Sequence, residues 1–393
     1  MKRELTDAVR YFTEETGIMS GLSVACGTKD WAETAMGGEN IREETVFDLA
    51  SLTKLFTLVC TMKLREEGRL DLSRSAFSYD PRFLGLRDLS LQEMISFRKS
   101  LQTPGRIDGS EDRKEAELRL FAVRDDGPSG KRAYSDIPAM VMKYVLESAA
   151  GQPFFECVRE RVLIPAGMHH TWARVPENRR RDCQTYRREH RIENGKMILR
   201  EGTPAGVPHD PKAAVLQGDS GDLCGHAGLF STIGDMIRFC QSLLRGDLLS
   251  ADSLAEIAVN RTGRRLPDGT YTQYLGYLCY LKHPDQYFSE VPVYMGGSAF
   301  GLAGFTGNHA AIDPEKGIFS LYLGNRVSDR LTVLIPGEGK EYSDYGLRKD
   351  GLGTFRWPDG ETVLSSVNYV HQKDSHFHNA VEKVLGESLN GLY

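Results

Sequence analysis

Patterns typical of β-strands occur at both ends of this chain, and patterns typical of helices fill its middle. Residues 21–38 have the pattern of two short strands joined by a polar turn, and residues 299–325 have that of three more. Apolar residues at helical spacing recur in between. We therefore expect an α/β (α+β) fold, in which one antiparallel sheet is built from both chain ends and a mostly helical part is inserted into it.

The same change of pattern sets the expected domain boundaries. Residues 1–75 and 271–393 are expected to form the sheet domain, and residues 76–270 the mostly helical domain. Residues 328–360 are rich in glycine and charge, which favours an inserted loop or hairpin. The helices are expected at residues 2–16, 51–67, 90–99, 113–123, 137–150, 154–164, 233–245 and 374–389.

Composition excludes several classes of protein. The 393 residues carry a net charge of −5, which gives no reason to expect nucleic acid or an anionic membrane as a partner. The N-terminal residues lack the apolar stretch of a secretory signal, and no later run approaches a membrane span, so we expect a cytoplasmic protein. The seven cysteines include no CxxC pair, which indicates buried, reduced thiols. A small molecule is the expected partner, and oligomeric state is not indicated.

The segment FDLASLTKLFT places Ser51 three residues before Lys54 at the head of an apolar helix. Free backbone N–H groups and the positive dipole end favour an oxyanion there, and Lys54 lies almost one turn further on the same side. A buried lysine amine can accept the serine proton. The alternative is a serine N-cap followed by a solvated lysine. One S-x-x-K match is expected by chance, and Ser96 with Lys99 forms a second, which we interpret as a coincidence.

The context of the first match resembles a known family. FDLASLTKLFT followed by LREEGRLDL is similar to the acyl-serine superfamily of class C β-lactamases, penicillin-binding proteins and related esterases. KRAYSDIPAMVMKYVLE resembles the second motif of that family, here Tyr134-Ser135-Asp136. The resemblance covers roughly residues 18–326. It implies a β-lactamase/transpeptidase-like fold, with Ser51 as nucleophile and with Lys54 and Tyr134 moving its proton.

The third family motif departs from the usual pattern. Leu302-Ala303-Gly304 stand where the resemblance implies Lys-Thr-Gly or His-Thr-Gly, and Phe305 follows. The backbone N–H of Phe305 can serve with that of Ser51 as an oxyanion donor, because a backbone group does not depend on the side chain. Leucine cannot bind a carboxylate, which favours a substrate with an apolar or uncharged acyl part. Asp136, where asparagine is usual, adds a negative charge that can hold Lys54 protonated.

Other candidate sites carry less weight. His209, Asp210 and His226 allow a metal cluster, but their spacing matches no compact metal motif, so we expect them to fix loops beside the cleft, with no metal and no cofactor. The basic segment 174–196 also contains acidic residues, which indicates a solvated loop.

Two functions therefore remain open. The first is a serine hydrolase that acts on an ester or amide of a small molecule through an acyl-serine intermediate, or that transfers the acyl group to another acceptor. The alternative is a catalytically impaired β-lactamase-like protein that binds or senses a small molecule, suggested by Leu302 and Asp136.

Overall fold

A six-stranded antiparallel sheet forms the centre of the computed structural model, which describes residues 2–218, 221–285 and 290–390. The first and last thirds of the chain pair directly in this sheet, since Gly21 of one strand lies opposite Asn325 of the neighbouring strand. The strands in spatial order are β2 (Ala32–Gly38), β1 (Gly21–Thr28), β12 (Ile318–Asn325), β11 (Asn308–Asp313), β10 (Phe300–Gly304) and β9 (Tyr280–Leu281). The expectation of one sheet built from both chain ends is confirmed.

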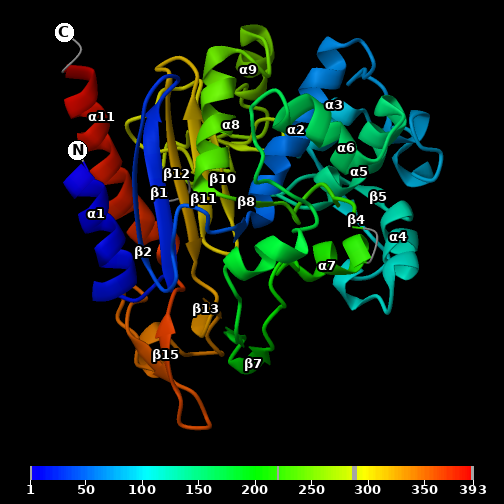
Figure 1. Cartoon of the computed structure of the whole chain (residues 1–393). Coiled ribbons are helices and arrows are strands. Elements are labelled where there is room, and N and C mark those ends of the chain that lie inside the picture. Colours follow the sequence, from blue (N-terminus) through cyan, green and yellow to red (C-terminus); the bar gives the residue numbers. More distant parts are fainter. Residues whose placement is uncertain (1, 219–220, 286–289, 391–393) are drawn as a thin grey trace.

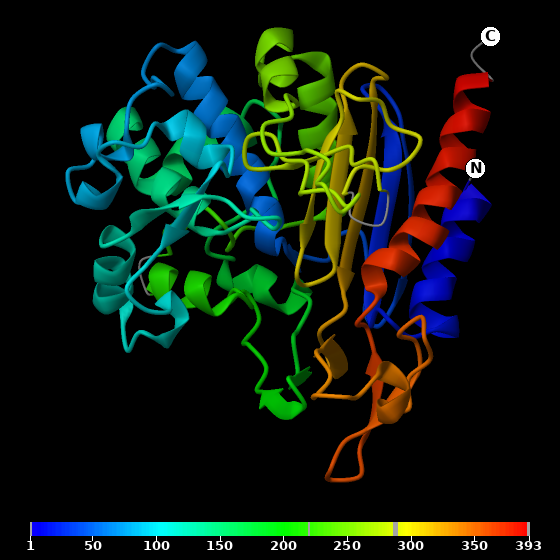
Figure 2. The same ribbon diagram turned by 180° about the vertical axis from the view of Figure 1, so that it is seen from behind.

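Helices cover both faces of this sheet. Figure 1 shows α1 (Lys2–Arg10) and α11 (His378–Asn390) together on one side, and α8 (Ile233–Arg245) on the other. The view from behind in Figure 2 shows the same layers. The remaining helices are α2 (Thr53–Glu66), α3 (Leu91–Ile95), α4 (Arg113–Phe121), α5 (Ile137–Ala150), α6 (Phe154–Val158), α7 (Pro211–Gln217), α9 (Ala251–Ile257) and α10 (Tyr369–Gln372). This arrangement confirms the expected mixed α/β fold.

A second sheet extends from one end of the first, at the bottom of Figure 1. Its strands in order are β14 (Thr354–Arg356), β15 (Thr362–Ser365), β13 (Arg330–Leu334), β6 (Glu189–Glu193) and β7 (Lys196–Arg200), with β13 parallel to both neighbours. Residues 328–360, expected as a loop or hairpin, thus supply two strands. The hairpin β6–β7 corrects the expectation of a solvated loop over the basic segment 174–196. The proposed domain boundaries stay a prediction.

Two short strand pairs lie outside these sheets, and short 3-10 and π-helical turns, among them Ala50–Leu52, connect the elements. The strand pairs are β3 (Phe47–Asp48) with β8 (Phe230–Ser231), and β4 (Lys99–Gln102) with β5 (Arg124–Pro128). The first pair matters most for the site, because β3 leads directly into the turn that carries Ser51.

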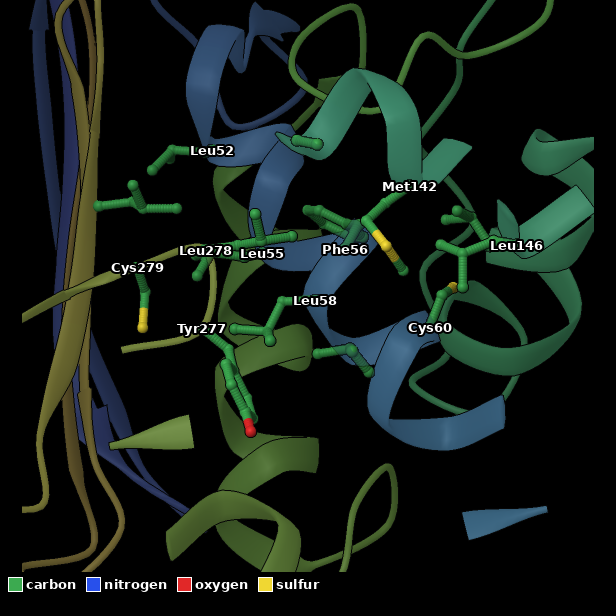
Figure 3. Close-up of a cluster of buried hydrophobic side chains, with 14 of the residues drawn as sticks. Leu52, Leu55, Phe56, Leu58, Cys60, Met142, Leu146, Tyr277, Leu278 and Cys279 are labelled. Carbon is green, nitrogen blue, oxygen red and sulfur yellow. The ribbon is translucent and has the colours of Figure 1, made fainter. Parts of the chain in front are cut away.

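Helix α2 lies in the middle of the largest hydrophobic core and is buried on nearly all sides. Figure 3 shows its apolar side chains between those of α5 and those of the loop before β9. The labelled side chains are Leu52, Leu55, Phe56, Leu58 and Cys60 near α2, Met142 and Leu146 of α5, and Tyr277, Leu278 and Cys279. Because α2 is packed into the core on nearly all sides, Lys54 on its first turn and Ser51 directly before it are held in a rigid place.

All seven cysteine side chains are buried, and none forms a disulfide in the described part of the chain, in line with the expectation of buried thiols. Among the described residues, no helix combines the length and the apolar character needed to cross a membrane.

Candidate active site

The turn before α2 is held by one buried carboxylate. Asp48 Oδ1 accepts a hydrogen bond from the backbone N–H of Ala50 at 2.9 Å, and its Oδ2 accepts one from that of His209 at 2.7 Å. Burial raises the pKa of Asp48, and these two hydrogen bonds oppose the rise. Ala50 has φ +47°, a left-handed conformation that costs free energy for a residue with a Cβ. Backbone strain is therefore stored directly before Ser51.

Ser51 and Lys54 form the expected pair. Lys54 Nζ lies 2.9 Å from Ser51 Oγ and also donates to the backbone oxygen of His226 at 3.3 Å. The Lys54 side chain is fully buried, and no side chain caps the N-terminus of α2. The alternative of a serine cap with a solvated lysine is therefore wrong.

Asp136 contacts the same lysine from the segment before α5. Its Oδ1 lies 2.8 Å from Lys54 Nζ, and its carboxylate does not cap α5. Burial acts to lower the pKa of Lys54, but Asp136 and then Tyr134 raise it, and the net shift is upward. Burial acts to raise the pKa of Asp136, but Lys54, His226 and Lys212 lower it well below its usual range. The pair is therefore an ammonium and a carboxylate at neutral pH.

Tyr134 reaches the same centre. Lys54 Nζ lies 5.0 Å from the centroid of its ring, and its backbone N–H is fixed by Gln273 Oε1 at 2.9 Å. Its phenol oxygen is shielded from solvent and lacks a hydrogen-bond partner of good geometry among the described residues. Burial raises the pKa of Tyr134, while the charge of Lys54 and the nearness of Ser51 act to lower it. The three side chains expected from the first two motifs are thus close together.

Asp136 has a second cationic partner that the sequence analysis missed. Lys212 Nζ lies 3.0 Å from Asp136 Oδ2 and 3.2 Å from Asp210 Oδ2. Asp210 caps α7 by accepting from the backbone N–H of Ala213, and its Oδ1 lies 3.0 Å from His226 Nε2. The order Asp210-Pro211 is a helix-start signal that could have placed Lys212 in the first turn of this helix.

The side chains of Lys54, Asp136, Lys212, Asp210 and His226 form a row in which positive and negative charges alternate. Burial acts to lower the pKa of His226, but Cys224 and Asp210 raise it to about 10. Burial likewise acts to lower the pKa of Lys212, and the carboxylates of Asp136 and Asp210 shift it upward. Three cations, Lys54, Lys212 and His226, therefore surround the two carboxylates.

The three residues that would allow a metal cluster, His209, Asp210 and His226, are not all brought together. His209 turns its Nε2 to Glu189 Oε2 at 3.1 Å, away from Asp210 and His226. The ligand atoms of Asp136, Asp210 and His226 do lie within 4.8 Å of one another. Their carboxylates already face the ammonium groups of Lys54 and Lys212, so a metal ion at this place would have to displace lysine.

The loop that contains His226 approaches α5 closely. Gly225 has φ +87°, and a Cβ at this position would lie 2.3 Å from the backbone oxygen of Ala139. The carbonyl of Gly225 accepts a hydrogen bond from Thr57 Oγ1 of α2 at 2.6 Å. The loop is thus fixed to both helices that carry the site.

Strand β10 passes beside the turn of Ser51. A Cβ at Gly304 would lie 2.8 Å from the backbone oxygen of Leu49, so glycine permits this approach. Leu302 lies on the same face of the strand, fully buried in the core, and the side chain of Ala303 points to the other face. The carbonyl of Phe305 accepts a hydrogen bond from the buried Arg326 Nε at 2.7 Å, which fixes the backbone next to the nucleophile.

Ser51 opens into a pocket of about 540 Å³. Its wall includes several charged side chains from the hairpin β6–β7 and from neighbouring loops. The lining residues are Ala50, Ser51, Arg106, Asp108, Arg191, Glu193, Ile198, Arg200, His209, Asp210, Pro211, Lys212, Ala227, Phe305 and Thr306. The lining thus carries both charges, and the expectation of an apolar or uncharged acyl part stays a prediction.

A buried acid holds two of these arginines. Glu189 is fully buried and lies 2.8 Å from Arg191 Nη1 and 2.9 Å from Arg200 Nη1. Burial acts to raise the pKa of Glu189, but His209, Thr332 and the arginines lower it to about 2. The dipeptide Asn194-Gly195, with φ +52° and +76°, is the hairpin signal that could have placed these arginines on neighbouring strands.

The second S-x-x-K match forms no comparable pair. Ser96 Oγ donates to the backbone oxygen of Gln92 at 2.6 Å, and Lys99 Nζ bonds Asp125 Oδ2 at 3.0 Å. The interpretation of this match as a coincidence is confirmed.

Comparisons with known proteins show the family of the chain. The family model described as Beta-lactamase matches residues 12–334. A protein of Escherichia coli (strain K12) named "Putative D-alanyl-D-alanine carboxypeptidase" is 28% identical over 225 residues, which are 51% of this chain and 51% of that protein. One of the same name from Escherichia coli O157:H7 is 26% identical over 319 residues, 72% of this chain and 69% of that protein. The chain thus spans about half the length of the first relative.

Solved structures share the fold. EstCE1, described as a hydrolase with promiscuous acyltransferase activity, superposes with a TM-score of 0.63 at 18% identity, over 82% of this chain and 94% of that one. A class C beta-lactamase mutant gives 0.62 at 15%, over 82% and 92%. A mutant of simvastatin synthase (LovD) from Aspergillus terreus gives 0.61 at 14%, over 85% and 92%.

Proposed function

Since this chain belongs to the beta-lactamase family, we propose that it is a serine hydrolase that cleaves an ester or amide of a small molecule through an acyl-serine intermediate. The single observation that carries the proposal is the hydrogen bond of 2.9 Å between Lys54 Nζ and Ser51 Oγ at the mouth of a pocket of about 540 Å³. A buried amine in contact with a serine hydroxyl is the arrangement that activates a nucleophile.

The reaction would proceed in two steps. Ser51 Oγ attacks the carbonyl carbon and gives its proton to neutral Lys54, while the backbone N–H groups of Ser51 and Phe305 stabilise the oxyanion. The bond to the leaving group then breaks, and the phenol of Tyr134 passes a proton to the departing oxygen or nitrogen. In the second step, the Tyr134 phenolate takes a proton from the attacking water, and the Lys54 ammonium returns its proton to Ser51 Oγ as the acid is released. An alcohol or amine in place of water would give acyl transfer, the activity named for EstCE1.

The lysine has to lose its proton before it can act as a base. The ion pair with Asp136 at 2.8 Å favours the ammonium form, so the reactive form is a minority at neutral pH. We therefore propose an activity that increases as the pH is raised above neutrality.

The pocket wall supports a polar substrate. Arg200, held by Glu189, and Arg191, held by both Glu189 and Glu193, line the cavity into which Ser51 opens. Guanidinium groups bind carboxylates well. A substrate with a carboxylate or other strong acceptor fits this wall, and a D-alanyl-D-alanine peptide, suggested by the names of the relatives, is one such compound.

A second candidate function is that of a binding or sensing protein. The observation that favours it is the same ion pair, because a lysine held as ammonium by Asp136 does not accept a proton from Ser51. Such a protein would use the pocket without covalent chemistry.

Covalent labelling separates the two functions. The protein is treated at several pH values with a fluorophosphonate and with activated esters, and its intact mass is measured. We expect a stable adduct on the wild type and none on Ser51→Ala, with peptide mapping to Ser51. Turnover is then compared between a D-alanyl-D-alanine peptide and simple esters. Labelling absent from the wild type at every pH would contradict the hydrolase and favour the binding protein.

A further inference from the structure

Lys212 contacts the candidate catalytic groups although it belongs to none of the three motifs. It is the second residue of α7, its side chain is 27% exposed, and it lines the pocket into which Ser51 opens. Its Nζ lies 3.0 Å from Asp136 Oδ2. The fold therefore adds a second lysine to the pair of Lys54 and Asp136.

The two lysines contact different oxygens of the same carboxylate. Lys54 occupies Oδ1 of Asp136 at 2.8 Å, and Lys212 occupies Oδ2 at 3.0 Å. An opposite charge stabilises an ammonium group, and a like charge close by destabilises it. Asp136 thus holds the proton on Lys54, while Lys212 opposes this hold through its own positive charge.

We propose that Lys212 is a positioning residue, which shares the Asp136 carboxylate with Lys54 and thereby limits how strongly this carboxylate holds the Lys54 ammonium. The inference rests on the proposed acyl-serine function, in which Lys54 accepts the proton of Ser51. The two lysines that contact Asp136 therefore have different roles. Lys54 touches the nucleophile, and Lys212 acts only through Asp136.

Other charged and titratable groups face this row from the elements around it. Asp210 binds Lys212 at 3.2 Å and keeps its ammonium oriented between the two carboxylates. Further groups that act on Asp136, Lys212 or their partners are Tyr134, Tyr280, Asp48, Asp108, Cys224 and His226. Because the pKa of His226 is raised to about 10, the experiment has to observe Lys54 itself as well as activity.

The test compares Lys212→Met, Lys212→Arg and a matched control, Lys99→Met. Lys99 and Asp125 form a lysine–aspartate pair of similar exposure, 29% and 28%, that lies outside the pocket. For each variant, the rate of fluorophosphonate labelling at Ser51 is measured against pH. The pH range in which this rate increases is the ascending limb of the profile. Independently, ¹³C NMR of lysine Cε, assigned with Lys54→Met, gives the titration midpoint of Lys54. Thermal unfolding shows that each variant is folded.

We expect Lys212→Met to move both the limb and the Lys54 midpoint to higher pH, by about 0.5–1 unit, with labelling near neutrality reduced about two- to threefold, because the stronger basicity of Lys54 offsets part of the loss. Lys212→Arg keeps the charge and should restore both, and Lys99→Met should change neither. A Lys54 midpoint that is unchanged or lower in Lys212→Met would overturn the inference. Wild type that is not labelled would contradict the proposed hydrolase, whereas the NMR midpoint would still decide the role of Lys212.

Discussion

Replacing Asp136 by asparagine should make the protein more reactive at neutral pH. Asp136 Oδ1 lies 2.8 Å from Nζ of the fully buried Lys54, and an opposite charge at this range raises the pKa of an amine by about 1–3 units. An asparagine side chain would lack the charge but keep a carbonyl oxygen as acceptor. The pKa of Lys54 should therefore fall by about 1–3 units in Asp136→Asn, and burial would then favour the neutral amine.

The size of the effect follows from this shift. Each unit raises the neutral fraction of Lys54 about tenfold while the pKa stays above the working pH, and the weaker basicity of the amine offsets part of the gain. We expect fluorophosphonate labelling of Ser51 near neutrality to rise about three- to tenfold, with its ascending limb at lower pH. Stability should fall by about 3 kcal/mol, because Lys54 and Lys212 lose a buried counterion.

The assay is the pH profile of the second-order labelling rate, together with urea unfolding. Asp125→Asn removes the carboxylate of the matched pair with Lys99 and should leave the profile unchanged. A limb that stays in place or moves to higher pH in Asp136→Asn would show that Asp136 does not control the proton on Lys54. The electrostatic account of the site would then be refuted.

Three further changes test the framework around the site. Gly225→Ala should destabilise the protein by about 2–3 kcal/mol in urea unfolding, since its Cβ would lie 2.3 Å from the Ala139 oxygen at φ +87°, and an unchanged midpoint would contradict this contact. Thr57→Val should cost about 1 kcal/mol, because the bond of 2.6 Å to the Gly225 oxygen is lost. Glu189 has a pKa lowered to about 2 against an ordinary 4.5, so its stabilisation of about 3 kcal/mol is present above pH 4.5 and is lost as pH falls through 2. Unfolding of Glu189→Gln should therefore depend less on pH in this window than that of the wild type, and parallel curves would refute the assignment.

The parts of the fold that sequence predicted well have strong local signals. The apolar spacing placed a helix at residues 233–245, and α8 has these bounds, with Thr232 as its cap and Gly246 as its end. The residues between β11 and β12 likewise include Pro314 and Gly317, which are typical of a turn. In such segments, capping and turn residues agree with the tertiary structure, so local pattern is sufficient.

The elements that sequence missed depend on distant partners. The strand β6 is short and charged, and it is stabilised by β13, which follows more than a hundred residues later. Lys212 carries no motif, and only the packing of α7 beside Asp136 gives it a place in the site. The charge of Asp136 did predict its effect on Lys54, since both residues lay in recognised motifs. A second cation on the other oxygen requires knowledge of three-dimensional contacts.

The direct pairing of β1 with β12 has a consequence for how the protein is made. A ribosome releases Gly21 long before Asn325, so β1 has an unpaired edge while most of the chain is still being synthesised. Phe305 also emerges late, and the pocket of Ser51 therefore cannot close on a nascent chain. Such distant pairing makes folding slow, and covalent reactivity should appear only after Phe305 and β12 have been synthesised and have paired.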